Sequence, residues 1–323
     1  MYYRYVIRRV LNAVAIYVVI VLAFSLMFNT VNETNARAEI EESIRAESMR
    51  LKNMNARQIQ QWMTERRAFK YHAYHLDQPF VGRVVWHTID TVTFQYGLSN
   101  GMKSSRGDRE VWKIVVEVLP RTILLFTTAI VFEVGFGIWL GLKMAQRAGR
   151  LLDKSSSVMT MIVNGMPTWW LGMILIMVFA YKVPLFPSGG MHTLPPPQGV
   201  MRLVDVLWHM ALPLVTLLLT GFWGVALLAR NIVLSILQED YIMAARARGL
   251  PERTVLFGHT LRTAAPPFTT IALLSLLTSV FGGIVFEGIF SWPGMGNLYW
   301  ISIESNDIPV LLGLLSVTTG LYI

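Results

Sequence analysis

The 323-residue chain contains no cysteine, and only 15% of its residues are charged. The absence of cysteine excludes a disulfide framework and any zinc or redox site built on thiolates. The chain also lacks the Gly-x-x-x-x-Gly-Lys-Ser/Thr loop that cradles nucleotide phosphates and the His-Glu-x-x-His pattern of zinc hydrolases. We therefore predict that the chain is not an enzyme and binds no cofactor of its own.

Apolar residues dominate instead: 54% of the chain is hydrophobic, and the mean hydropathy is +0.47. A soluble core cannot hide so much apolar surface, so the composition predicts a polytopic membrane protein in contact with the lipid bilayer. The formal net charge is +8. The basic residues lie beside apolar runs rather than among stacking aromatics, and we therefore expect no nucleic-acid partner.

Six apolar runs are long enough, or nearly so, to cross the ~30 Å core of a bilayer as helices. They occupy residues 10–28, 123–142, 158–181, 207–237, 268–290 and 308–323. The last run has 16 residues, which at about 1.5 Å per residue gives roughly 24 Å. We therefore predict an all-α protein with six transmembrane helices, of which the sixth is expected to be truncated in this chain.

Short flanking segments set the predicted orientation, because lysine and arginine accumulate on the cytoplasmic side of membrane spans. Basic residues precede the first run, follow the second and follow the fourth: Arg4, Arg8, Arg9, Lys143, Arg147, Arg150, Lys154, Arg246, Arg248, Arg253 and Arg262. Both termini are therefore expected in the cytoplasm, with the protein in the cell membrane. The polar stretch between the first two runs is then exterior, and its composition from Glu33 to Lys70 predicts helices.

The polar segment between the fourth and fifth runs is the most informative feature of the chain. Three alanines favour a helix with almost no side-chain bulk, so a partner protein can approach the backbone closely: Ala244, Ala245 and Ala247. Gly249 can take the left-handed conformation that ends a helix, and Pro251 suits the first turn of the next helix. The segment therefore predicts a helix, a sharp turn and a second helix. Composition alone explains it equally well as a basic loop facing anionic lipid.

Three sets of residues carry a resemblance to a known family. The first set runs from Asp240-Tyr241 through Ala244-Ala245-Arg246-Ala247-Arg248-Gly249-Leu250 to His259, Leu261-Arg262 and Pro267. The second runs from Glu287 to Gly296 and is followed by Asp307-Ile308-Pro309, and the third is Leu76-Asp77-Gln78-Pro79. In this order and spacing they resemble the permease subunits of ABC importers, in the dipeptide, oligopeptide and nickel branch.

The resemblance implies the type I importer permease fold. Residues 1–28 would form an N-terminal transmembrane helix, residues 29–118 an exterior helical region, and residues 119–323 a permease core of five transmembrane helices. A cytoplasmic coupling loop would occupy residues 238–266. This loop would dock on an ATPase through Asp240, Tyr241, Ala244, Ala245, Arg246, Ala247, Arg248, Gly249, Leu250, His259 and Arg262.

The resemblance also implies the partners of the chain. A second homologous permease subunit would complete the pore, and two cytoplasmic ABC ATPase subunits would carry the ATP and Mg. An exterior solute-binding protein would deliver a peptide-like or other small solute. The alternative function is a self-sufficient secondary transporter, for which Glu133 offers an ion-coupling carboxylate but no internal repeat gives support.

Polar and small residues within the runs are candidates for the pore and its gate. Glu133 lies inside the second run, where an ionisable group is costly unless it is paired or faces water. A lining role, a hydrogen-bonded helix contact and a protonated acid all stay open for it. The other candidates lie in the fifth run: Thr278, Ser279, Gly282, Gly283 and Glu287. Gly137 and Gly141, four residues apart, predict close helix packing and nothing more specific.

The segment after the fifth run cannot continue a helix, because it contains proline and two glycines. It predicts an aromatic element at the outer surface, either an outer gate or an interfacial anchor. The outer-gate candidates are Trp292, Pro293, Gly294 and Gly296. His72 and His75 share the spacing of metal ligands on a helix, but no third ligand lies nearby, so we predict no metal site.

Overall fold

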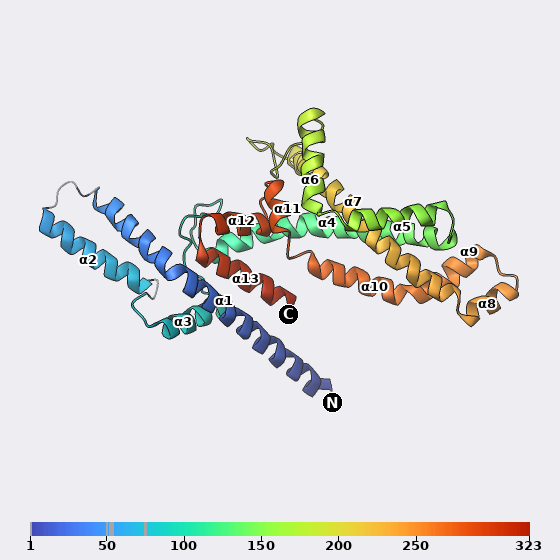
Figure 1. Cartoon of the computed structure of the whole chain (residues 1–323), viewed down its shortest axis with the longest axis horizontal. Helices are drawn as coiled ribbons and strands as arrows, with labels where there is room; N and C mark the ends of the chain where they lie inside the picture. The colour runs from blue at the N-terminus through green and yellow to red at the C-terminus, as the bar shows by residue number, and fades with distance from the viewer. Residues whose placement is uncertain (1, 50, 52–54, 74–75) are drawn as a thin grey trace. The chain divides into compact units, whose positions relative to one another are not determined.

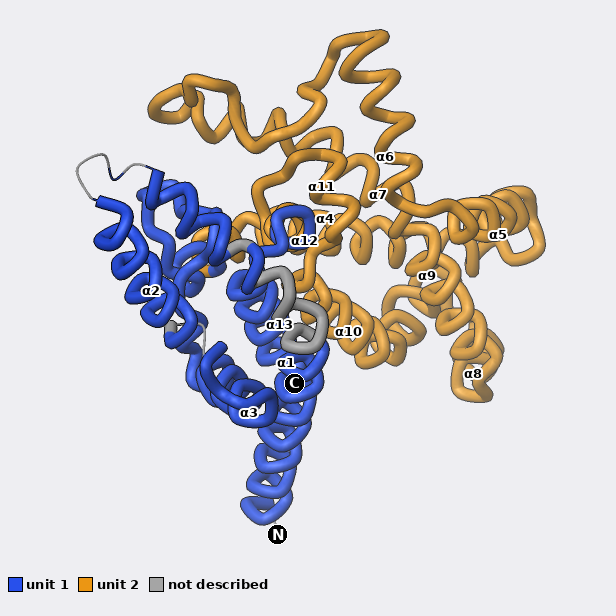
Figure 2. The backbone as a smooth tube through the Cα atoms, turned by 60° about the vertical axis from the view of Figure 1, so that its left-hand side comes forward, with its two compact units in different colours: residues 1–115, 302–323 blue, residues 116–301 orange. Residues whose placement is uncertain are grey.

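The computed structural model describes residues 2–49, 51, 55–73 and 76–323. The regular structure of these residues is helical, apart from one isolated antiparallel bridge between Leu98 and Glu110 (Figure 1). The all-α prediction is therefore confirmed for the described part of the chain. Figure 2 distinguishes two compact units, of which unit 1 comprises residues 1–115 and 302–323 and unit 2 comprises residues 116–301.

Unit 1 is built around α1 (Tyr2–Ser48), a single helix of 47 residues. Its first part, Tyr2–Met27, is long and apolar enough to cross a membrane, in agreement with the first predicted span. Two helices that follow α1 in the chain, α2 (Ala56–Ala73) and α3 (Phe80–Val92), pack against it, as does α13 (Ile308–Tyr322). Figure 1 shows α2 running beside the second part of α1. The helices predicted from Glu33 to Lys70 are thus confirmed in the described residues of that stretch.

Unit 2 carries the remaining helices. They are α4 (Val111–Gln146), which begins in unit 1, α5 (Leu151–Asn164), α6 (Thr168–Ile176), the π-helix η1 (Met177–Lys182), α7 (Val200–Leu237), α8 (Asp240–Ala247), α9 (Glu252–Thr254), the π-helix η2 (Val255–Thr260), α10 (Leu261–Thr278), α11 (Ile284–Ile289) and α12 (Met295–Glu304), which ends in unit 1. By length and composition, α4 and α7 are candidate membrane spans in addition to α1.

The predicted span at residues 158–181 is not one straight helix, because this stretch is broken. α5 and the following α6–η1 pair are bent by 92° at a short break, and they count as one further candidate span only if taken together. The break contains Gly165, Met166 and Pro167. Pro167 has no amide hydrogen to donate, and its ring disfavours helical backbone at Met166, so α5 must end here.

The predicted span at residues 268–290 is likewise not one continuous helix. α10 ends at Thr278 and α11 begins at Ile284. Between them Gly282 has a φ of +62°, a left-handed conformation that glycine adopts without steric cost, and Gly283 is extended. The backbone therefore changes direction inside the apolar run that hydropathy alone treats as continuous.

Close packing of α4 on α7 confirms the prediction made for Gly137 and Gly141. A Cβ atom on Gly137 would lie 2.6 Å from the side chain of Val225, and one on Gly141 would lie 2.5 Å from the carbonyl oxygen of Ala226. α4 therefore cannot carry a larger residue at these two points, and the two backbones approach closely.

Candidate functional site

The polar segment that follows α7 folds as helix, turn and helix, as predicted. Gly249 has a φ of +78° and closes α8 in the left-handed conformation. The amides of Gly249 and Leu250 donate to the carbonyl oxygens of Arg246 and Ala245, at 2.9 and 3.4 Å. This pair of bonds is the Schellman arrangement, which satisfies the last carbonyls of a helix. We call residues 238–266 the coupling segment.

One face of the coupling segment is buried in unit 2. Ile242 and Ala245 of α8 are 0% and 1% exposed, and Val255 and Leu256 of η2 are buried beside them. They share one apolar cluster with residues from the ends of α4, α7 and α10: Ala145, Ala229, Val233, Ile236, Ala264 and Phe268. A close-packed interior transmits displacement, so a push on α8 reaches α7 and α10 directly.

The opposite face of α8 is exposed and carries two alanines. Ala244 and Ala247 face outward together with Met243 and Arg248. Arg246 is also exposed, but it donates to Glu252 through Nε at 2.8 Å and through Nη2 at 3.3 Å. This arginine therefore braces the turn between α8 and α9, a role that the sequence did not indicate.

The remaining coupling candidates lie around the junction of α8 with α10. Tyr241 donates from its hydroxyl to Thr263 at 2.9 Å, which joins the start of α8 to α10. His259 is partly buried, whereas Asp240 and Arg262 are exposed. The structure thus brings all eleven candidates onto one segment at the end of α7 (Figure 1).

The candidates that follow α10 gather around one buried carboxyl group. Glu287 is 0% exposed and accepts hydrogen bonds from the hydroxyl of Thr122 at 3.0 Å and the amide of Asn297 at 3.1 Å. The hydroxyl of Thr122 in turn accepts the amide of Met295 at 2.7 Å. The network ties the connection between α11 and α12 to α4. We call it the Glu287 network.

Three glycines make room for the Glu287 network. A Cβ atom on Gly294 would lie 2.3 Å from Oε2 of Glu287, and one on Gly282 would lie 2.5 Å from Oε1. A Cβ atom on Gly296 would lie 2.6 Å from the carbonyl oxygen of Gly283. Real Cβ atoms do not approach other atoms so closely, so these positions require glycine.

Trp292 belongs to the core rather than to an exposed aromatic belt. It is 0% exposed, and its Nε1 donates to the carbonyl oxygen of Arg121 at 3.1 Å. Arg121 donates back through Nη1 to the carbonyl oxygen of Pro293 at 3.3 Å. The alternative of an interfacial anchor is therefore wrong for Trp292 in this structure, because its ring is covered by the chain itself.

Thr278 and Ser279 lie outside the Glu287 network. Ser279 is 3% exposed and accepts a hydrogen bond from the hydroxyl of Thr127 at 2.9 Å, which joins α10 to α4. Thr278 is exposed, and its hydroxyl donates to the carbonyl oxygen of Ser275 at 2.7 Å. Only Thr278 of this pair presents a side chain to the outside of the unit.

Glu133 lies against α7 one turn before Gly137. A Cβ atom on Gly221 would lie 2.2 Å from the carboxyl carbon of Glu133, so the carboxyl group rests on the backbone of Gly221. Glu133 is partly buried, and no described residue forms a hydrogen bond or an ion pair with it. The alternative of a hydrogen-bonded helix contact therefore has no partner residue in the described chain.

The sequence did not reveal Thr122, Asn297 or the ion pair of Asp153 with Arg230. Asp153 near the start of α5 and Arg230 on α7 are 77 positions apart in sequence, and they meet through two bonds of 2.8 Å. The available signal was weak: Asp153 is an acidic residue inside a basic flank, and Thr122 is a single hydroxyl at the start of an apolar run.

Ser99 lies in a Gly-Leu-Ser-Asn-Gly stretch that matches the nucleophile pattern of some hydrolases. It is 1% exposed, and its hydroxyl donates to Oδ2 of Asp307 at 2.5 Å while accepting the amide of Met102 at 2.7 Å. A nucleophilic hydroxyl must be exposed to its substrate. Ser99 therefore fixes the loop before α4 to the start of α13.

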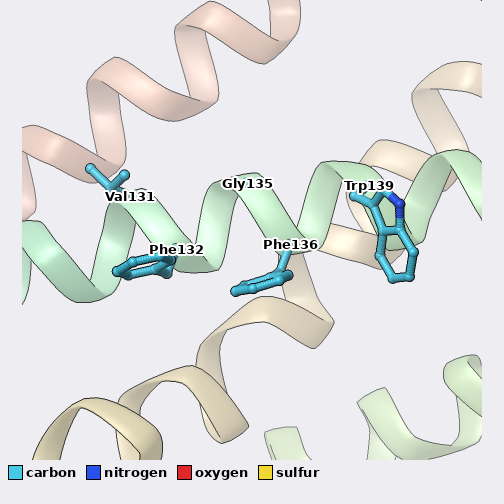
Figure 3. A pocket seen from close by; sticks show the side chains of 5 residues that line it. All are labelled: Val131, Phe132, Gly135, Phe136 and Trp139. Carbon is cyan, nitrogen blue, oxygen red and sulfur yellow. The ribbon is translucent and has the colours of Figure 1, made fainter. Parts of the chain in front are cut away.

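One side of α4 presents an open hollow of about 370 Å³. Figure 3 shows its lining, in which Phe132 and Phe136 point to the same side of the helix. The two rings stack with centroids 6.1 Å apart. The hollow is lined by Val131, Phe132, Gly135, Phe136 and Trp139. An apolar face of this kind suits lipid chains or another apolar helix rather than water.

The described residues contain no group of three or more histidine, cysteine, aspartate or glutamate side chains that could hold a metal ion. His72 lies 2.9 Å from Asp77 through Nδ1, and it is exposed. His75 lies outside the described residues.

Comparison with known proteins gives a consistent result. Residues 133–323 match the family described as "Binding-protein-dependent transport system inner membrane component". The chain is 32% identical over 223 residues to the oligopeptide transport system permease protein AppB of Bacillus subtilis, which covers 69% of this chain and 70% of the relative. It is 32% identical over 225 residues to the di/tripeptide transport system permease protein DppB of Pseudomonas aeruginosa, which covers 65% of this chain and 67% of the relative. The dipeptide transport system permease protein DppB of Escherichia coli is 31% identical over 221 residues, which cover 63% of this chain and 65% of the relative.

Proposed function

The chain belongs to the family of binding-protein-dependent transport system inner membrane components, and from this premise we propose that it forms half of the translocation pathway of an ATP-driven importer. As a member of this family it is a permease, hydrolyses no ATP itself and binds no cofactor. The observation that carries the proposal is the coupling segment. It combines an exposed helix face that carries Ala244 and Ala247 with a buried face fixed to α4, α7 and α10.

Energy then comes from two separate cytoplasmic ATPase subunits, which hold the ATP and Mg. Each ATPase receives one coupling helix, with residues 240–250 in its cleft and Arg248 as a polar contact. A second homologous permease supplies the other half of the pathway, and an exterior binding protein delivers the solute. The family description supports the binding protein and the transport system in general terms.

We place the six membrane spans of the type I permease fold on α1, α4, α5 with α6 and η1, α7, α10 with α11, and α13. The basic flanks support a cytoplasmic amino terminus, because they lie before α1, between α4 and α5, and in the coupling segment. The two interrupted stretches, α5 with α6 and η1 and α10 with α11, fit this assignment. Irregular backbone in a membrane is tolerated where protein or water surrounds it.

Peptides are the solute that we propose. The relatives described above are named for oligopeptide, dipeptide and tripeptide transport. A secondary transporter is not favoured, because membership of the family assigns the chain to a transport system with further components.

Within the pathway we assign a lining role to Glu133, Thr278, Gly282 and Gly283, whereas the buried Ser279 joins α10 to α4. Residues 292–296 form an outer gate, with Trp292, Pro293, Gly294 and Gly296 as its parts. Glu287 anchors this gate through its bonds to Thr122 and Asn297, so the gate moves together with α4.

The transport step follows from the packing of the coupling segment. ATP binding draws the two ATPases together, and each ATPase displaces its α8. Because Ile242 and Ala245 share a cluster with Val233 and Phe268, the displacement reaches α7 and α10 as a rigid movement. The membrane helices then change from an inward-facing to an outward-facing arrangement.

A substitution on the exposed face of α8 tests the assignment. Ala244→Trp places a large ring where the ATPase must approach, and Ala46→Trp places the same ring on an exposed position of α1 as a control. The chain is purified from its native membrane in mild detergent, with mass spectrometry of the partners and an ATPase assay.

We expect the unsubstituted chain and Ala46→Trp to bring down two ATPase chains, a second permease and nucleotide hydrolysis. Ala244→Trp should reach the membrane but lose the ATPase chains. A lone unsubstituted chain that moves solute in response to an ion gradient would overturn the proposal.

A further inference from the structure

We propose that the carboxylate of Glu133 binds the cationic amino group of the solute during its passage through the membrane. The inference rests on the proposed function, in which peptides cross a pathway lined in part by α4 and α7. It commits to one chemical class, the primary ammonium group, which an unmodified peptide carries at its amino terminus.

The first step concerns the place of Glu133 on α4. Gly137 and Gly141 follow it at intervals of four residues, and both pack tightly on α7. Residues four apart share one face of a helix, so Glu133 continues this contact by one turn. Here the glutamate is on α4, and the glycine that makes room for it, Gly221, is on α7.

The second step is that Glu133 lacks a partner. Its carboxyl group rests on Gly221, and within the described chain it has neither a hydrogen-bond donor nor a cation. Its oxygens are not among the fully buried atoms without a partner, so they reach the surface of the unit. A carboxylate in a membrane span is costly unless another group pairs with it. The described chain offers no such group, so a cation that pairs with the charged form of Glu133 has to come from elsewhere.

The third step places Glu133 at the edge of the apolar side of α4. Val131 is two residues away, about 160° around the helix from Glu133, whereas Phe136 is three residues away, about 60° around it. Val131 belongs to the aromatic hollow of Figure 3. On the side of Glu133, a Cβ atom on Gly224 of α7 would meet nothing within 4 Å, so open space lies on α7 one turn beyond Gly221.

These features suit an ammonium group that binds briefly. Such a group donates charge-assisted hydrogen bonds to a carboxylate and needs no fixed donor from the protein. Gly221 provides a flat backbone surface on which the carboxylate is held, so Gly221 is a positioning residue and Glu133 the binding residue.

The test compares two solutes that differ only in the charge of the amino terminus. The complete complex, reconstituted in vesicles with ATP, is given alanyl-alanine or its N-acetylated form at concentrations well below saturation. We expect Glu133→Gln to lower uptake of the free dipeptide by about tenfold, the effect of losing one charge-assisted hydrogen bond. Uptake of the acetylated form should not change. Glu133→Asp keeps the charge and should restore part of the preference.

Gly221→Ala provides an independent variant, because its Cβ atom would displace the carboxyl group of Glu133. It should reduce the same preference while leaving the charge in place. An equal loss for both dipeptides in all variants would show a structural role and overturn the inference. An unchanged preference in Glu133→Gln would overturn it as well.

Labelling of a single thiol separates this inference from the proposed function. The chain has no native cysteine, so Glu133→Cys and the matched control Val131→Cys each introduce one. A water-soluble cationic thiol reagent should label position 133 and not position 131. A complex that imports no peptide would reject the proposed function, whereas an unlabelled position 133 would reject the site whatever the complex transports.

Discussion

Arg230 on α7 and Asp153 near the start of α5 form an ion pair with two bonds of 2.8 Å, one to each carboxylate oxygen. The side chain of Asp153 is 4% exposed and that of Arg230 is 25% exposed. Asp153 also accepts the amide of Gly149 at 2.8 Å. The pair thus fastens the α4–α5 turn to α7, next to Ala229 of the cluster that holds the coupling segment.

Asp153→Ala should destabilise unit 2. It leaves Arg230 without its partner and removes the acceptor of the Gly149 amide. A buried pair broken in this way costs ~3–5 kcal/mol, and we expect about 1–3 kcal/mol here because Arg230 keeps contact with solvent. The check is the apparent melting temperature of the purified chain in detergent.

The exposed pair of Lys113 with Glu110 serves as the control. Its atoms lie 3.2 Å apart, with side-chain exposures of 47% and 55%. Glu110→Ala should therefore change stability by less than about 1 kcal/mol. Equal melting temperatures for the Asp153 and Glu110 variants would show that the two-bond geometry adds nothing.

Gly249→Val should abolish transport without preventing membrane insertion. The φ of +78° is an unfavourable conformation for a β-branched residue, although a Cβ atom there would meet nothing within 4 Å. The cost is therefore backbone strain of about 1–3 kcal/mol, and it falls on the turn that positions α8. The measurement is ATP-dependent uptake, with the amount of chain in the membrane determined in parallel.

Gly249→Asn is the matched variant, because asparagine tolerates the left-handed conformation far better than valine. It should keep most of the uptake. Full uptake by Gly249→Val would rule out a coupling role for this turn.

Local signals made the coupling segment predictable. Alanine, glycine and proline at Ala244, Gly249 and Pro251 act through their own backbone preferences, and the structure has the expected helix and left-handed turn. The helices of residues 33–70 were predictable in the same way from their composition. In such segments the information lies within a few consecutive residues.

Contacts between distant residues could not be predicted. Hydropathy treats residues 268–290 as one run, although Gly282 turns the backbone and Glu287 folds back onto Thr122. The pair of Asp153 with Arg230 likewise depends on how α5 and α7 meet in space. No pattern within one segment indicates such a contact, so the Glu287 network became visible only in the structure.

Gly294→Ala should destabilise the Glu287 network. The new methyl group would lie 2.3 Å from Oε2 of Glu287 and 2.4 Å from the hydroxyl of Thr122. Both atoms are held by further hydrogen bonds, so relief requires breaking part of the network. Overpacking of this kind costs about 1–3 kcal/mol, which thermal unfolding in detergent would detect.

Gly135→Ala provides the comparison, because a Cβ atom at Gly135 would meet nothing within 4 Å. Alanine also favours a helix over glycine by about 1 kcal/mol, so this variant should be neutral or stabilised. If Gly294→Ala unfolded at the same temperature as Gly135→Ala, the close contacts around Glu287 would carry no energetic weight.

The contact between α1 and α2 should weaken in acid. Arg67 donates to Glu41 at 2.5 and 2.6 Å, and this bond holds the pKa of the Glu41 carboxyl below its usual value of 4.5. Lys70 and Arg66 donate to Glu47 at 2.9 and 3.0 Å, and the bond from Lys70 is the main cause of a lowered pKa there too.

A carboxyl whose pKa is lowered by folding stabilises the folded state fully above its unfolded pKa of about 4.3, and it loses that contribution as the pH falls through the folded pKa. The Glu41 and Glu47 side chains are 30% and 35% exposed, so each contributes only about 0.3–1 kcal/mol. Amide hydrogen exchange of α2, corrected for the intrinsic effect of pH, should therefore speed up slightly between pH 6 and about pH 3. Glu41→Gln should exchange faster already at pH 6 and respond less to acid, because its side chain cannot titrate. An acid response of equal size in both chains would show that the Glu41–Arg67 pair does not hold α2 in place.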